Sequence, residues 1–201
     1  MTKEIKNKEG EKGFFAGLLD VLESFVIAVA CVVFIFLFIA RLSVVNGDSM
    51  NNTLKENDYL VVVNPFFTYE PENGDIVVVH GNYGDYNLPL VKRVIATEGQ
   101  TITINIKTKQ VFINGELLNE EYAYYMAGIP LRVPQTEGGE YNSATGEFTV
   151  TVPEGHVFVM GDNRCNSADS RIEEISFINE NNILGKAVYR VAPFSKIGKI
   201  Q

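Results

Sequence analysis

The longest apolar stretch of the chain lies near its N-terminus. Phe25–Ala40 contains no charged side chain, and apolar residues continue backward to Leu18 and forward past Arg41 to Val45. About 20 apolar residues cross a bilayer as a helix. The pattern therefore predicts a transmembrane anchor over residues 18–42.

Four lysines precede this apolar stretch, at Lys3, Lys6, Lys8 and Lys12. The positive-inside rule places such a lysine-rich segment in the cytoplasm. Residues 1–17 are then a cytoplasmic N-terminus, and residues 43–201 form an extracytoplasmic domain. The alternative is a secretory signal peptide, for which Val45-Asn46-Gly47 is a passable cleavage site. Cleavage there would release the domain that follows.

Beyond residue 58 the pattern changes to short runs that are rich in β-branched residues. Asn114-Gly115 between two such runs is a strong hairpin signal. The expected strands are Tyr59–Val63, Ile76–His80, Thr101–Ile106, Gln110–Ile113, Glu116–Leu118, Phe148–Val152, His156–Met160 and Ala187–Val191.

Two stretches interrupt this series of strands. Glu121–Gly146 has a weak pattern and is interpreted as a loop-rich excursion, within a small insert at about 105–150. Glu173–Asn181 is the one downstream segment with some helical character. The predicted fold class is mainly β, with twisted, partly closed antiparallel β-sheets behind one N-terminal transmembrane helix.

Composition excludes several classes of function. The 201 residues are 46% hydrophobic, which is enough for a core, and the net charge of −8 argues against a basic face that binds nucleic acid. The two histidines do not cluster with cysteines, so a zinc site is not expected. Cys31 lies in the apolar run and Cys165 in a distant polar loop, so no disulfide is expected.

Ser49 is a candidate nucleophile just beyond the apolar run. A serine hydroxyl needs an adjacent base before it attacks a carbonyl carbon. His80 and His156 are possible bases, although each lies at the end of an apolar strand, where a structural role is common. Serine in a Gly-Asp-Ser turn also occurs without any catalytic role.

Lys92 is the other candidate base. If the stretch Leu88–Ala96 is a strand, Leu90, Lys92 and Val94 share one face, and Arg93 points to the other. A lysine among apolar neighbours loses its proton readily, because burial can lower its pKa by several units. The alternative is a lysine on an edge strand that faces water and prevents aggregation.

A third polar segment, Gly161–Arg171, reads GDNRCNSADSR and follows a predicted strand. Its density of hydrogen-bonding side chains suggests a built polar network. The simpler interpretation is a turn with charge pairs such as Asp169 with Arg171.

Together these segments resemble bacterial type I signal peptidases, in the short form with one anchor that is typical of Gram-positive bacteria. The shared motifs occur in the family's order behind an N-terminal span. They are Gly47-Asp48-Ser49-Met50 with Thr53-Leu54, Gly74-Asp75-Ile76-Val77-Val78, Lys92-Arg93-Val94-Ile95, and Gly161-Asp162-Asn163-Arg164 with Ser167, Asp169, Ser170 and Arg171.

The resemblance implies a Ser-Lys dyad on a fold shared with repressor autoproteases. Ser49 would be the nucleophile and Lys92 the general base. The supporting roles implied are that Ser167 orients Lys92, that Asp169 and Arg171 form an ion pair, and that Met50 shapes the site.

The implied activity is removal of signal peptides from exported preproteins, by cutting after small-x-small sites at the outer face of the cytoplasmic membrane. The expected partners are the signal peptides of secretory preproteins and the lipid bilayer, close to the secretion translocon, with no nucleic acid. Neither a metal nor an organic cofactor is expected.

Two positions depart from the family pattern. Asn52 stands where the family usually has proline, which would stiffen the turn. Gly47 stands where some relatives carry a serine that helps to bind the oxyanion. The oxyanion would then depend more on the backbone N–H of Ser49.

A substrate pocket is also expected around the pair. Val45, Leu54, Leu90 and Val91 could line a shallow pocket that accepts alanine and rejects bulky side chains. An extended substrate could add as a strand along Leu88–Val91. Two rivals remain open, a repressor-type autoprotease and an inactive anchored adaptor. The first usually has a DNA-binding domain, which the sequence does not show.

Overall fold

A computed structural model describes residues 2–65, 69–80 and 88–200, with side chains from residue 17 onward. The four N-terminal lysines used for the topology prediction therefore lie outside the described side chains. The chain divides into two compact units, Met1–Ala40 and Arg41–Gln201. Each unit is described by itself.

The first unit is a long helix, α1 (Thr2–Phe34), which continues into the π-helical turn η1 (Ile35–Ile39). The 23 residues Gly17–Ile39 have a mean hydropathy of 2.8 and the length and composition to cross a membrane. The predicted anchor, residues 18–42, extends too far, because Ala40–Val44 forms strand β1 beside β2. Apolar side chains suit both states, so hydropathy alone could not locate this change.

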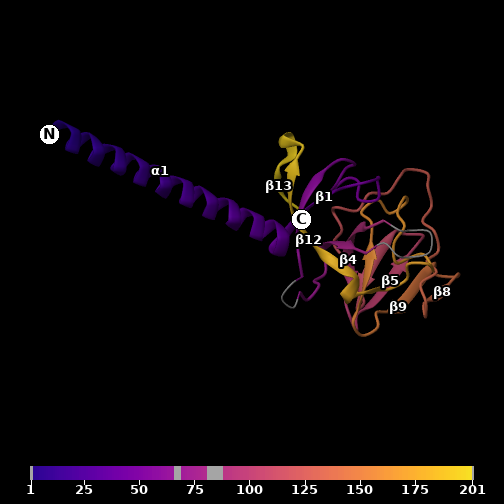
Figure 1. The fold of residues 1–201 in the computed structure, drawn as a ribbon. Coiled ribbons are helices and arrows are strands. Elements are labelled where there is room, and N and C mark those ends of the chain that lie inside the picture. The colour runs from indigo at the N-terminus through magenta and orange to yellow at the C-terminus, as the bar shows by residue number, and fades with distance from the viewer. Residues whose placement is uncertain (1, 66–68, 81–87, 201) are drawn as a thin grey trace. The chain divides into compact units, whose positions relative to one another are not determined.

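The second unit consists of two antiparallel sheets (Figure 1). The larger sheet has the order β1-β2-β12-β3-β4-β10-β11, with β13 on β12. Its remaining strands are β2 (Tyr59–Val63), β3 (Ile76–Val79), β4 (Leu90–Ala96), β10 (His156–Met160), β11 (Ile178–Asn179), β12 (Ile183–Ala192) and β13 (Gly198–Lys199).

The second sheet has the order β7-β6-β5-β9-β8. Its strands are β5 (Thr101–Asn105), β6 (Gln110–Ile113), β7 (Glu116–Leu117), β8 (Glu140–Asn142) and β9 (Glu147–Thr151). Two 3₁₀ turns flank β12, η2 (Glu180–Asn182) and η3 (Phe194–Lys196). The mainly β, antiparallel fold class is confirmed.

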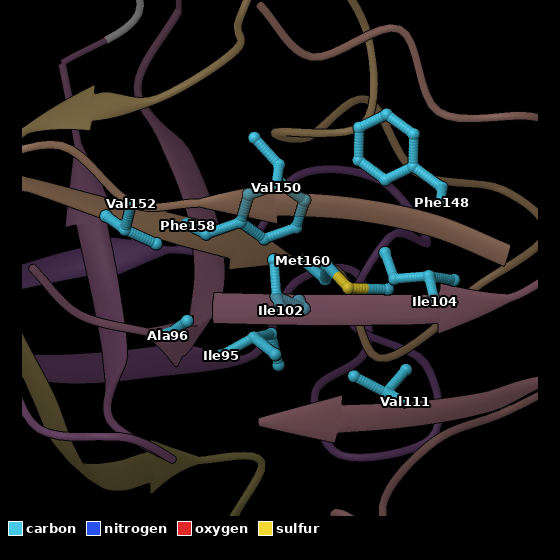
Figure 2. Close-up of a cluster of buried hydrophobic side chains, with 10 residues drawn as sticks. All are labelled: Ile95, Ala96, Ile102, Ile104, Val111, Phe148, Val150, Val152, Phe158 and Met160. Carbon is cyan, nitrogen blue, oxygen red and sulfur yellow. The ribbon is translucent and has the colours of Figure 1, made fainter. Parts of the chain in front are cut away.

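The main hydrophobic core joins the two sheets. Figure 2 shows ten of its side chains, from β4 and β10 of the larger sheet, from β5, β6 and β9 of the smaller, and Val152 directly after β9. Phe148 and Phe158 are its largest members, 2% and 0% exposed. A second cluster, which includes Val45, Met50 and Leu54, packs against β2 and β3. This second cluster fixes the segment that carries Ser49.

The predicted helical character of Glu173–Asn181 is wrong. Ile178 pairs with Val157 as part of β11, and the Asn179 side chain accepts a hydrogen bond from the Asn181 N–H at the start of η2. Pairing with β10 thus replaces the helix. The excursion expected over Glu121–Gly146 has no strand before β8, which the sequence pattern did not predict.

Candidate active site

Ser49 lies in the loop that follows β1, and hydrogen bonds and a buried side chain fix the conformation of this loop. Gly47 has a φ of +83°, a left-handed conformation that favours glycine, so a serine would be strained there. The backbone N–H of Asn163 donates to the Ser49 carbonyl (2.9 Å), and the Asn163 amide donates to the Asp48 carbonyl (3.2 Å). Met50, the residue after Ser49, is 1% exposed and anchors the loop in the core.

Lys92 lies on β4, an interior strand between β3 and β10. Its Nζ is 2.8 Å from the Ser49 hydroxyl oxygen and 2.9 Å from the Val91 carbonyl oxygen, and the residue is 2% exposed. The alternative of a water-facing lysine on an edge strand is therefore wrong. Alternation along β4 brings Lys92 to Ser49, 43 residues earlier in the chain.

Burial sets the protonation state of Lys92. Desolvation lowers its pKa from 10.5 to about 8, Asp169 and Asp162 oppose this change, and Arg171 adds to it. A substantial fraction of the amine is therefore neutral near pH 8. A neutral amine at 2.8 Å can accept the proton of the Ser49 hydroxyl.

The polar segment after β10 approaches the serine backbone at Gly161. A Cβ at this position would lie 2.4 Å from the Ser49 carbonyl oxygen and 2.3 Å from the Ser167 Oγ. The Gly161 N–H donates to Asp169 (2.9 Å), and Arg171 binds the same carboxylate at 2.8 Å. Burial would raise the pKa of Asp169, but the charge and hydrogen bonds of Arg171 outweigh it and hold that pKa below its usual range.

Ser167 does not make the hydrogen bond to Lys92 that was expected of it. Its Oγ makes no hydrogen bond of good geometry within the described residues, although it lies close enough to Asp169 to help lower the pKa of that carboxyl. Lys92 donates to Ser49 and Val91 instead. Two of the three possible N–H donors of a protonated Lys92 are thus in use. Ser167 nevertheless lines a cavity together with Ser49 and Lys92.

A buried ion pair next to the site was not predicted from the sequence. Arg93, the neighbour of Lys92, binds Asp162 through two N–H groups at 2.8 and 2.7 Å. Thr53 donates to the same carboxylate (2.5 Å), and the Tyr122 ring lies 3.8 Å from the Arg93 guanidinium carbon. Asp162 thus ties together the serine loop, β4 and the segment after β10.

A second unpredicted pair connects the segment after β7 to the polar segment. Arg164 donates to both oxygens of Glu120, one of them at 2.9 Å, and these contacts raise the pKa of Arg164 despite its burial. The density of polar residues in Gly161–Arg171 was the only signal in the sequence. It could not identify partners 44 and 69 residues away.

An apolar cavity of about 360 Å³ lies on one side of the Ser49–Lys92 pair. Val45, Leu90 and Val91 line it as expected, and so does Met50. Leu54 does not, because it is fully buried in the cluster beneath. A larger cavity of about 640 Å³ also includes Ser49 and Lys92.

Neither histidine is placed to act on Ser49. His80 and His156 line neither of these two cavities, and the His156 ring contacts the Glu154 carbonyl instead (2.7 Å). Within the described ranges, no group of His, Cys, Asp and Glu side chains could hold a metal ion. Cys31 and Cys165 are both free thiols.

Comparison with known proteins identifies relatives over most of the chain. Residues 18–192 match the family described as signal peptidase, peptidase S26. A probable signal peptidase I-1 from Synechocystis is 38% identical over 81% of this chain and 76% of its own length. Signal peptidase I S from Bacillus subtilis is 37% identical over 90% of this chain and 93% of its own.

Signal peptidase IB from Staphylococcus aureus is 31% identical, over 89% of this chain and 92% of its own length. These matches define the class of the protein as a serine endopeptidase. The chain belongs to the signal peptidase family, peptidase S26. Its relatives and its N-terminal apolar helix fit a membrane-anchored protein.

Proposed function

We propose that this chain is a membrane-bound signal peptidase that removes N-terminal signal peptides from exported preproteins with a Ser49–Lys92 dyad. The observation that carries the proposal is the 2.8 Å separation of Lys92 Nζ and Ser49 Oγ. This short distance joins the Ser49 hydroxyl, which alone is a weak nucleophile, to the amine of Lys92. Burial lowers the pKa of that amine to about 8. The named relatives are signal peptidases I, which supports the same substrate class.

In the proposed reaction, neutral Lys92 accepts the Ser49 proton while the hydroxyl oxygen attacks the scissile carbonyl. The lysine then protonates the leaving amine, and the mature protein departs. Water next attacks the acyl-enzyme ester with the same lysine as base, which releases the signal peptide and restores Ser49.

The negative oxygen formed during attack needs hydrogen-bond donors. The Ser49 backbone N–H makes no hydrogen bond within the described part of the chain, so it is available for this role. Gly47 offers no hydroxyl. We therefore assign the main oxyanion contact to the Ser49 N–H.

Ser167 is proposed to act on the protonated lysine. Lys92 donates to two oxygens, and the Ser167 hydroxyl, which makes no hydrogen bond of good geometry within the described residues, lines the same cavity. After proton transfer, Lys92 has a third N–H, and the Ser167 hydroxyl oxygen is proposed to accept it. Ser167→Ala should therefore lower kcat more than it raises KM.

The apolar cavity is proposed to bind the residues before the scissile bond. Val45, Met50 and Val91 line the cavity of about 360 Å³ beside Ser49, and this lining supports binding of apolar side chains such as alanine. The exposed Leu88 and the first residues of β4, Leu90–Lys92, offer an extended edge to which a substrate strand can add, because these residues of β4 pair with β3 and not with β10. This arrangement supports the proposed cutting after small-x-small sites.

The location of the reaction follows from the helix. The apolar helix Gly17–Ile39 is proposed to anchor the enzyme, with the residues before it in the cytoplasm and the unit that begins at Arg41 outside, near the secretion translocon. Ser49 follows the apolar Gly17–Ile39 by ten residues in the chain. So short a connection supports a nucleophile that acts close to the membrane, where the end of a signal peptide emerges.

The test is processing of a purified preprotein by the wild type, Ser49→Ala, Lys92→Ala and the double variant. Each single variant should abolish processing with the fold retained, and the double variant should lose no more, because the two residues act as a unit. The matched controls Ser195→Ala and Lys199→Ala change exposed residues that line neither cavity at Ser49. Substantial processing by Lys92→Ala would remove the lysine from the mechanism.

A further inference from the structure

The larger cavity beside Ser49 has no role in the reaction described so far. It holds about 640 Å³, a size typical of binding sites for small molecules or peptide segments. Ser49, Lys92, Asn46 and Leu90 line both this cavity and the apolar one. The Ser49–Lys92 pair therefore lies where two cavities of different chemistry meet.

The walls of this polar cavity are fixed by hydrogen bonds. The Gln135 N–H donates to the Arg171 carbonyl (2.8 Å), and the Thr136 hydroxyl donates to the Ser170 carbonyl (2.6 Å). Leu131 is buried at the base of the same loop. The loop that carries Arg132 is thus held against the segment that carries Ser167, and the cavity exists before a ligand binds.

Three charged side chains in this cavity, Asp48, Arg132 and Glu174, have no oppositely charged partner among the described residues. Arg164 and Arg171 are each paired with a carboxylate, whereas the exposed Asp48 accepts only a hydrogen bond from the neutral Asn51 amide. Arg132 and Glu174 are exposed and, within the described residues, form neither an ion pair nor a side-chain hydrogen bond. A charged substrate side chain can therefore interact with either of them.

A peptide whose scissile bond lies at Ser49 must continue in two directions. The apolar cavity suits the small side chains before the bond, so the polar cavity remains for the chain after it. We propose that the polar cavity binds the first residues of the mature protein, and that Arg132 and Glu174 select the charge of the side chains there. This inference rests on the proposed function.

Charge reversal tests the selection. Peptides that share one Ala-x-Ala site carry Asp, Ala or Lys at each of the first three positions after the scissile bond. For each position, the measured quantity is kcat/KM of the Asp peptide divided by kcat/KM of the Lys peptide. At the position that contacts these charges, Arg132→Glu should lower this ratio about three- to fivefold, as expected for exposed charge pairs. Glu174→Lys should raise the ratio by a similar factor. The control Lys199→Glu changes an exposed lysine outside the cavity and should leave the ratio unchanged.

The outcomes separate this inference from the proposed function. Cleavage of the alanine peptide with the same charge ratio in wild type, Arg132→Glu and Glu174→Lys would overturn the inference and leave the function intact. Failure of the wild type to cleave the alanine peptide would overturn both. A shift equally large in Lys199→Glu would show a long-range effect of net charge and overturn the local assignment.

Cys165 lines the same cavity and can report which side of the scissile bond lies there. In the full chain with Ser49→Ala and Cys31→Ala, a peptide bearing an iodoacetyl group can alkylate the Cys165 thiol with loss of iodide. Labelling should be several times faster with the group two residues after the scissile bond than three residues before it, and it should vanish in Cys165→Ser. Equal labelling, or faster labelling from the signal-peptide side, would overturn the proposal.

Discussion

Lys92 is a cationic side chain placed where its charge is unfavourable. At 2% exposure its pKa falls from 10.5 to about 8, which is a free-energy cost of burial in the protonated form. The same cost makes the neutral amine available at moderate pH. Burial of Lys92 thus lowers the stability of the fold at neutral pH and provides the proposed base.

Lys92→Met should therefore stabilise the fold while it abolishes processing. At pH 7 we expect a gain of about 1–3 kcal/mol, because an apolar side chain of similar length replaces a buried ammonium. Between pH 8 and 10.5 the unfolded wild type binds more protons than the folded form, so its stability rises and the gain shrinks.

Denaturant unfolding in detergent across this pH range measures the gain. Lys199→Met, at an exposed site, is the control and should change stability little. Destabilisation by Lys92→Met at pH 7 would show that the amine contributes more through its hydrogen bonds than it costs through burial.

Gly161 is required by a close approach of two segments. Any side chain there would meet the Ser49 carbonyl oxygen at 2.4 Å. Gly161→Ala should displace the serine loop and lower kcat/KM on the order of a hundredfold, since small misplacements of reacting groups have effects of that size. Gly198→Ala, with no atom within 4 Å of the added carbon, should be neutral in the same assay. Equal activity of both variants would contradict the packing argument.

At the scale of elements, Asp162 holds three segments together. It pairs with Arg93 on β4 and accepts from Thr53 in the loop after Ser49. Asp162→Ala leaves the buried guanidinium without this carboxylate, and we expect a loss of about 3–5 kcal/mol. The double variant Arg93→Met, Asp162→Ala should recover part of that loss, because no buried charge remains.

Thermodynamic comparison of the two single variants and the double variant measures this coupling. Lys186→Ala is the control, since Lys186 is partly exposed in its ion pair with Asp75 and should cost about 1 kcal/mol or less. Additive losses in the double variant would show that Arg93 and Asp162 stabilise the fold independently.

The same scale shows what the sequence could predict. Strands that are rich in β-branched residues, such as Tyr59–Val63, and strands beside a strong turn signal, such as Gln110–Ile113, were predicted at their observed bounds. Short strands such as β8 and β11 were not found, because two or three residues acquire strand geometry only from their partners. Local pattern likewise suggested a network in Gly161–Arg171 but could not supply Arg93 or Glu120.

At the scale of the whole molecule, the lysines before the apolar helix predict its orientation. Single cysteines at Lys12 and at the exposed Glu56, in a chain without Cys31 and Cys165, report the two sides of the membrane. A membrane-impermeant thiol reagent should label Glu56→Cys in intact cells and label Lys12→Cys only after lysis. The reverse pattern would invert the proposed topology.

The identity of the base is the central claim, and the pH profile of kcat/KM tests it most directly. Protonated Lys92 cannot accept the Ser49 proton, so activity on a peptide substrate should rise with pH through about 8. His80→Ala and His156→Ala should leave this limb in place. The contrary result would be an acidic limb at about 6.5, the usual pKa of histidine, that disappears in either histidine variant. That result would contradict the Ser49–Lys92 assignment.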